Sequence, residues 1–155
     1  MKIDGNFLTS RMPLGASDAA AAIIVTEDGR YLLQLRDDIP QIWYPGHWGL
    51  FGGAVDAGED EIQALRRELQ EELELETTDP QRFVGFDFDL KPAGLKRYFR
   101  NYYEVRISED TLARLVLNEG AEMRTFSGDE ALSLPRLVPY DAFALFLHYQ
   151  RARLG

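Results

Sequence analysis

The sequence predicts an α/β fold in which a mixed sheet packs against helices. Short apolar segments with strand-like patterning lie on both sides of one long helical segment, residues 59–73, and a second helical segment covers residues 139–153. Such an order of elements buries its apolar faces best as stacked layers, so we expect an α/β sandwich with a mixed sheet. At 155 residues and 45% hydrophobic content, a single domain with a substantial core is expected over residues 1–155.

The first half of the chain predicts a hairpin, a loop and a third strand. Residues 19–25 form a short apolar run, and residues 27–29 read as a turn that leads into a return strand at 31–36. Residues 37–47 contain two prolines and a glycine, which favours a loop. A further strand is expected at residues 48–51, ahead of a glycine pair. The first 17 residues read as an N-terminal extension or a strand.

The segment 59–73 predicts a helix with one apolar face. It contains no proline or glycine and is dominated by residues that lose little rotamer freedom in a helix. Asp56 stands three residues before Glu59, which suggests a capping pair at the helix start. Apolar residues at steps of three and four predict a stripe that packs on the sheet: Ile62, Leu65, Leu69 and Leu73.

The second half predicts two long strands and a closing helix. Residues 83–90 and 97–107 alternate well around a turn that contains proline and glycine. Weaker strand signals lie at residues 115–117 and 123–126. The terminal helix is expected to open at Pro139 or Tyr140 and to run to about Arg153.

Three carboxylates of the first helix are expected to converge. Glu68, Glu71 and Glu72 are related as i, i+3 and i+4, so their side chains share one side of the helix. Without a counter-charge, like charges at this spacing repel each other. A cation bound between them makes the net interaction attractive. Mg²⁺ prefers oxygen ligands and is commonly held by one or two carboxylates together with substrate phosphates. The alternative is an acidic helix face that is only solvated.

The glycine turn and the helix together resemble the Nudix box, G-x5-E-x7-R-E-U-x-E-E-x-G-U, where U is a bulky aliphatic residue. The matching segments are Gly53-Ala-Val-Asp-Ala-Gly-Glu59 and Arg67-Glu68-Leu69-Gln70-Glu71-Glu72-Leu73-Glu74-Leu75. Eight of nine fixed positions agree, and Glu74 stands in place of the late glycine. The resemblance implies a Nudix-like α/β/α sandwich over roughly residues 18–150, with the box at residues 53–75.

The resemblance also implies roles for the box residues. Carried over by position, the metal site uses Glu68, Glu71 and Glu72 with the backbone at Gly53, and Arg67 orients the carboxylates by a salt bridge. Mg²⁺ is the implied cofactor, with Mn²⁺ able to substitute. Glu59 helps to set the junction of loop and helix, whereas Glu61 stands at a variable box position and is interpreted as surface charge. The family glycine closes the helix in a left-handed conformation that is costly for other residues, so Glu74 either bears that strain or the helix runs slightly further.

The implied activity is Mg²⁺-dependent hydrolysis of a pyrophosphate bond in a nucleoside diphosphate linked to another group. Nucleotide sugars and nucleoside triphosphates both fit this description. The proton acceptor is expected to be Glu71 or Glu72, or a residue of a late loop, where Glu119 and then Glu122 are the candidates. The alternative from another class is a non-catalytic Nudix module that senses a nucleotide.

The loop at residues 37–47 and the strand before it supply candidate substrate contacts. Arg36 could pair with phosphate through its guanidinium, although a solvated arginine at a strand end explains it equally well. Trp43 and Tyr44 could stack on a base, although core or dimer packing also accounts for them. His47 and His148 have no cluster of partner ligands in the sequence and are interpreted as structural.

Charge and cysteine content exclude several classes of protein. Of the net charge of −9, the segment 53–76 carries −7, with nine acidic residues and two arginines. This distribution suits a local cation site and leaves no basic surface for polymeric nucleic acid. The absence of cysteine excludes disulfides, thiolate zinc sites and cysteine nucleophiles, and it argues against the isopentenyl diphosphate isomerase branch of the family. Without a signal-like or membrane-spanning apolar run, a cytoplasmic protein is expected, and a homodimer is compatible with the composition.

Overall fold

Strand β1 (Ala19–Thr26) is the centre of the sheet in the computed structural model, which describes residues 17–154. The predicted N-terminal extension lies almost entirely outside the described residues. Strand β1 pairs in parallel with β6 along its whole length and antiparallel with β2 and β4. The sheet of the described residues has seven strands, the others being β2 (Tyr31–Leu35), β3 (Trp48–Gly49), β4 (Phe51–Ala54), β5 (Gln81–Asp89), β6 (Arg97–Ile107) and β7 (Glu122–Phe126).

The outer strands complete a mixed sheet, as the sequence predicted. Strand β5 pairs antiparallel with β6 at one end of the order, through the predicted turn, in which Lys91–Ala93 forms a short 3₁₀ helix. At the other end, β2 pairs antiparallel with both β3 and β7. The strands expected at residues 19–25, 31–36, 83–90, 97–107 and 123–126 are therefore confirmed to within a few residues at their ends.

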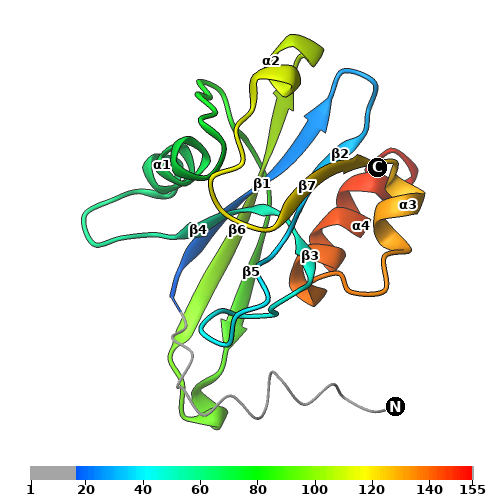
Figure 1. Cartoon of the computed structure of the whole chain (residues 1–155). Helices are drawn as coiled ribbons and strands as arrows, with labels where there is room; N and C mark the ends of the chain where they lie inside the picture. The colour runs from blue at the N-terminus through cyan, green and yellow to red at the C-terminus, as the bar shows by residue number, and fades with distance from the viewer. Residues whose placement is uncertain (1–16, 155) are drawn as a thin grey trace.

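Helices cover both faces of this sheet. Figure 1 shows α1 (Glu61–Leu73) on one side, and α3 (Gly128–Leu132) and α4 (Pro139–Leu154) on the other. Helix α2 (Glu109–Arg114) follows β6 at the end of the sheet. The α/β/α sandwich and both long helices are confirmed. The short helices α2 and α3 were not predicted, because segments of five or six residues carry too few turns to show a helical period.

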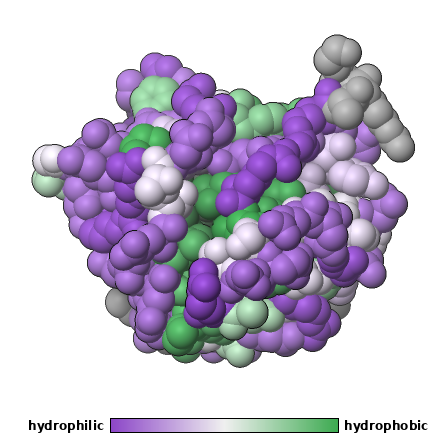
Figure 2. Space-filling view, turned by 90° about the horizontal axis from the view of Figure 1, so that it is seen from above, coloured by the Kyte–Doolittle hydropathy of each residue, from purple (hydrophilic) through white to green (hydrophobic). Residues whose placement is uncertain are grey.

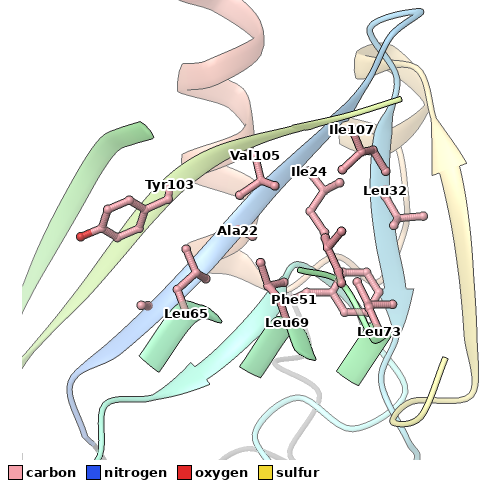
Figure 3. Packing of buried hydrophobic residues seen from close by; sticks show 12 residues of the cluster. Ala22, Ile24, Leu32, Phe51, Leu65, Leu69, Leu73, Tyr103, Val105 and Ile107 are labelled. Carbon is pink, nitrogen blue, oxygen red and sulfur yellow. The ribbon is translucent and has the colours of Figure 1, made fainter. Parts of the chain in front are cut away.

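The alternation of β1 divides the core into two layers. Ala20, Ala22 and Ile24 face α1, whereas Ala21, Ile23 and Val25 face the layer that contains α4. Figure 3 shows the predicted stripe of α1, with Leu65, Leu69 and Leu73 packed against the sheet. All three leucines are fully buried, so burial of this stripe fixes the rotation of α1 about its axis.

Two local predictions were wrong. Residues 115–117 do not form a strand, because the backbone there bonds to the end of α1: the amide of Val116 donates to the carbonyl of Leu73 at 3.1 Å. The single strand expected at residues 48–51 is divided into β3 and β4. The division falls at Leu50, whose amide donates to the Asp141 carboxylate at 3.0 Å and so leaves the ladder.

The exterior is mostly hydrophilic. Figure 2 shows polar residues over most of one face, with apolar residues visible in a central hollow. Within residues 17–154, no helix combines the length and apolarity needed to cross a membrane.

Candidate functional site

Helix α1 carries most of the predicted site, and its start is set by a capping box. The side chain of Asp60 accepts from the amide of Gln63 at 2.8 Å, and the Gln63 side chain accepts from the amide of Asp60 at 2.9 Å. The cap expected at Asp56 and Glu59 is therefore wrong for the helix itself. Those two residues close the preceding turn instead, where the Glu59 carboxylate accepts from the amide of Asp56 at 3.0 Å.

Arg67 joins the box loop to the carboxylates of α1. Its guanidinium donates to Glu59 at 2.7 Å and Glu68 at 2.9 Å, and to Glu71 at 3.3 Å. A further bond to the carbonyl of Ala54, at 3.0 Å, anchors it to β4. The hydrogen bonds that Arg67 donates to the Glu59 and Glu68 carboxylates raise the pKa of Arg67, so it is permanently charged. These contacts are compatible with the orienting role that the resemblance to the Nudix box implies for Arg67.

The glycine pair inside β4 lies directly against two of these carboxylates. A Cβ atom at Gly53 would lie 2.5 Å from the Glu68 carboxylate, so glycine lets the carboxylate lie directly against the strand. The amide of Gly52 donates to Glu72 at 2.9 Å. Gly52 has φ +134°, and a Cβ there would lie 2.2 Å from the carbonyl oxygen of Ala20. Gly52 is thus required by the backbone of β1, and a side chain at Gly53 would displace the Glu68 carboxylate.

Burial disfavours the ionised form of two of these carboxylates. Burial, together with the nearby charges of Glu68 and Glu119, raises the pKa of Glu72 to about 8 against the opposing bond from Gly52. Burial also raises the pKa of Glu68 despite its ion pair with Arg67. Gln34 donates to Glu72 at 3.4 Å, which is a weak bond. A nearby cation would favour the ionised form of both groups.

These residues fit a hard divalent cation by their chemistry. Glu68 and Glu72 present oxygen atoms beside the backbone of the glycine pair, which is the donor type that Mg²⁺ and Mn²⁺ prefer. Within residues 17–154, no three such side chains already surround one point. Glu71 pairs with Arg67 at 3.3 Å and its side chain is half-exposed. Glu68 and Glu72 are therefore the strongest candidate ligands.

The late loop brings Glu119 towards the same carboxylates. The amide of Asn118 donates to the carbonyl of Glu72 at 2.8 Å, and the amide of Ala121 donates to that of Leu35 at 2.9 Å, so both ends of the loop are held. Glu119 is exposed and raises the pKa of both Glu68 and Glu72, which places its charge near them. Glu122 lies on β7 and pairs with Arg124.

A pocket of about 230 Å³ adjoins the glycine pair. Arg36 and Trp43 line it together with Gly52 and Gly53, and the Arg36 Nε donates to the carbonyl of Trp43 at 2.9 Å. Two of the three predicted substrate contacts are therefore brought to the candidate metal site. Tyr44 does not line this pocket; its ring packs edge-on against Tyr140, 5.7 Å away.

The same pocket is lined by three residues that the sequence did not single out. Arg100, Tyr98 and Tyr140 line it, and the guanidinium of Arg100 lies 4.6 Å from the Tyr140 ring centroid. Arg100 donates to buried Asp141 at 3.1 Å and to the Tyr102 hydroxyl at 2.9 Å. Although burial alone lowers the pKa of Arg100, Asp141 and the tyrosine oxygens raise it overall. The period of two along β6 places Tyr98, Arg100 and Tyr102 on one face, and this signal could have identified them.

Three other polar residues have structural partners. Glu61 is not simple surface charge, because its carboxylate accepts from Asn101 and from the Tyr103 hydroxyl, both at 2.5 Å. His47 bonds the carbonyl of Pro45 at 2.8 Å. His148 is fully buried and bonds Tyr31 at 2.9 Å and Glu104 at 2.5 Å, with its ring packed on Phe83. The structural interpretation of both histidines is consistent with these contacts.

Comparison with known proteins adds three findings. A NUDIX domain model matches residues 16–152. A MutT protein from Methanosarcina mazei Go1 has a similar structure, with a TM-score of 0.72 and 22% identity over 93% of this chain and 99% of that one. The solution structure of the E. coli ORF135 protein is also similar, with a TM-score of 0.68 and 30% identity over 92% of this chain and 97% of that one.

Curated relatives match over a shorter segment. Nucleoside triphosphatase NudI of Escherichia coli (strain SE11) is 47% identical over 51 residues, which is 32% of this chain and 35% of the relative. The match thus spans about a third of the length of these relatives.

Proposed function

Because the chain belongs to the Nudix family, we propose that it is a Mg²⁺-dependent hydrolase of a pyrophosphate bond in a nucleoside diphosphate linked to another group. One observation carries this proposal. Gly52 and Gly53 contact the carboxylates of α1 and also line the pocket that holds Arg36 and Arg100. Candidate metal ligands and candidate phosphate contacts therefore adjoin the same two residues.

Different residues would bind the phosphate, hold the metal ion and accept the proton in such a reaction. Arg36 binds a phosphate at the pocket, and Arg67 keeps Glu68 in place beside Gly53. Glu68 and Glu72, with Glu71 on the exposed side, would hold the divalent cation, which would supply neutralisation of phosphate charge and a lower pKa for a bound water. A glutamate then takes the proton of the attacking water. Glu119 suits this role because it is exposed near the set, and Glu71 or Glu72 are the alternatives.

The relatives and the pocket indicate which compounds to test as substrates. The NudI relatives are named nucleoside triphosphatases, so nucleoside triphosphates come first. Nucleotide sugars come next, because aromatic walls at Trp43, Tyr98 and Tyr140 could hold a base or a sugar.

The test is phosphate release with a coupled phosphatase, in Mg²⁺ or Mn²⁺, for the wild type, Glu72→Gln and Glu76→Gln. Glu76 is an exposed glutamate four residues beyond Glu72 and serves as the matched control. We expect turnover that EDTA abolishes and that falls about 100-fold or more in Glu72→Gln, in line with loss of one key electrostatic group. Equal turnover in both variants would contradict the proposal. Tight nucleotide binding without turnover on any compound would favour the alternative, a non-catalytic Nudix module that senses a nucleotide.

A further inference from the structure

Arg100 is a buried cation whose charge is balanced before any ligand arrives. Its side chain is 14% exposed, and its partner Asp141 is 3% exposed. Asp141 is held in turn by the Tyr102 hydroxyl at 2.8 Å and by the amide of Leu50 at 3.0 Å. The pair is therefore rigid and close to neutral as a unit. A buried ion pair that opens onto a pocket suits a dipolar ligand group better than a second anion.

The remaining donors of Arg100 face a pocket built for a flat group. Nε bonds Tyr102 and Nη2 bonds Asp141, whereas Nη1 makes no hydrogen bond with any residue of the described part of the chain. The ring of Tyr140 lies under the guanidinium at 4.6 Å, and Trp43 and Tyr98 form other walls. No carboxylate lines the pocket among residues 17–154. A planar ligand that lies between these rings would meet only donors at the Arg100 edge.

We propose that Arg100, positioned by Asp141, is the residue that selects the nucleobase, and that it selects a base with a carbonyl oxygen beside an unprotonated ring nitrogen. Guanine presents O6 with N7, and cytosine presents O2 with N3, so both accept from two guanidinium N–H groups. Adenine places an amino group beside its ring nitrogen, and uracil places an N–H beside each carbonyl. In both of these bases a donor would face a donor, which leaves a desolvated group unpaired.

Arg36 takes a different part in this assignment. Its guanidinium lies in the same pocket, and among residues 17–154 no carboxylate pairs with it as Asp141 pairs with Arg100. The two arginines therefore divide phosphate binding and base selection between them. This inference rests on the proposed function only in taking the ligand to be a nucleotide.

The first test measures binding of nucleoside monophosphates by calorimetry in EDTA, so it requires neither metal nor turnover. For the wild type, we expect GMP and CMP to bind about tenfold more tightly than AMP and UMP. Arg100→Lys keeps a charge beside Asp141 but loses the planar fork, and should reduce the preference to less than about twofold. Arg97→Lys, on the same strand but in an exposed pair with Asp87, is the matched control and should keep the preference.

A second measurement keeps the test independent of the variant's folding. The wild type is titrated with 7-deaza-GMP, which lacks the N7 acceptor and should bind about tenfold more weakly than GMP. Equal affinities for the four bases, or an unchanged preference in folded Arg100→Lys, would overturn the inference. Selective binding without hydrolysis would contradict the proposed hydrolase but not the role of Arg100. Hydrolysis without base selection would contradict the role of Arg100 but not the proposed hydrolase.

Discussion

Glu74 adopts the left-handed conformation that the Nudix box reserves for glycine. It caps α1 with φ 54° and ψ 30°, and its amide bonds back to the carbonyls of Gln70 and Leu69. The helix therefore ends where a glycine would end it, and Glu74 bears the strain of that conformation. A non-glycine residue in this region costs about 1–2 kcal/mol, whereas glycine adopts it without a Cβ penalty.

We predict that Glu74→Gly stabilises the protein by about 1 kcal/mol, after allowing for the greater entropy of glycine in the unfolded chain. Urea unfolding measures the change, and turnover should stay within about twofold because Glu74 follows the carboxylates of the site. Glu76→Gly is the control, since Glu76 is exposed and has no positive φ. Equal effects of the two changes would show that the strain at Glu74 is negligible.

Glu72 gives the metal-free protein a characteristic dependence on pH. Its pKa is raised to about 8 in the folded state, mainly by burial, against 4.5 for the ordinary carboxyl. A raised folded pKa contributes stability that is complete below pH 4.5 and is lost as the pH rises through 8. In EDTA, we predict that the free energy of unfolding falls between pH 5 and 8, by at most about 1.4 kcal/mol per pH unit from this group.

The variant Glu72→Gln stays neutral and should remove that slope, whereas Glu76→Gln should keep it. Unfolding in urea at several pH values measures the difference between each variant and the wild type. Saturating Mg²⁺ should flatten the wild-type slope, because a cation favours the ionised carboxylate. Parallel pH profiles for the wild type and Glu72→Gln would refute the raised pKa.

At the scale of elements, the start of α1 shows how local chemistry places the site. The capping box at Asp60 and Gln63 sets the first turn, and Arg67, Glu68 and Glu72 follow at fixed angles around the helix. We predict that Asp60→Ala costs about 1 kcal/mol of stability in urea unfolding, as for other lost N-caps. Asp56→Ala should cost less than about 0.5 kcal/mol, because its ion pair with Arg67 is long, at 3.5 Å, and exposed. A larger loss of stability in Asp56→Ala than in Asp60→Ala would place the true cap at Asp56.

The elements that the sequence predicted well are those whose signal is local. The stripe of Leu65, Leu69 and Leu73 shows the helical period, and the carboxylates of the site share the same helix. The misassigned segment at 115–117 has a strand-like composition but takes its hydrogen bonds from the end of α1. Its conformation depends on a partner more than forty residues away, which no local pattern reports.

For the whole molecule, the distinction between local and long-range contacts also separates the candidate metal site around Arg67 from the pocket wall at Arg100. The contacts of Arg67 with Glu59, Glu68 and Glu71 join residues at most eight positions apart, so the box motif contains them. The contact of Arg100 with Asp141 spans 41 positions and depends on how α4 docks on β6. Spacing along the chain cannot show such a pair. The alternation of β6 could have indicated only that Arg100 shares a face with its neighbouring tyrosines.

Asp141 joins three parts of the molecule in one buried network. It lies in the first turn of α4 and bonds Arg100 and Tyr102 of β6 and the amide of Leu50 between β3 and β4. Asp141→Ala would leave a buried cation and two buried donors without their acceptor. We therefore predict that Asp141→Ala lowers the free energy of unfolding in urea by about 3 kcal/mol or more.

Asp129→Ala is the matched control, because Asp129 also lies in the first turn of a helix but is exposed. It should change stability by less than about 0.5 kcal/mol. Similar small losses in both variants would mean that α4 is held by its apolar face alone, and that Arg100 is positioned without Asp141.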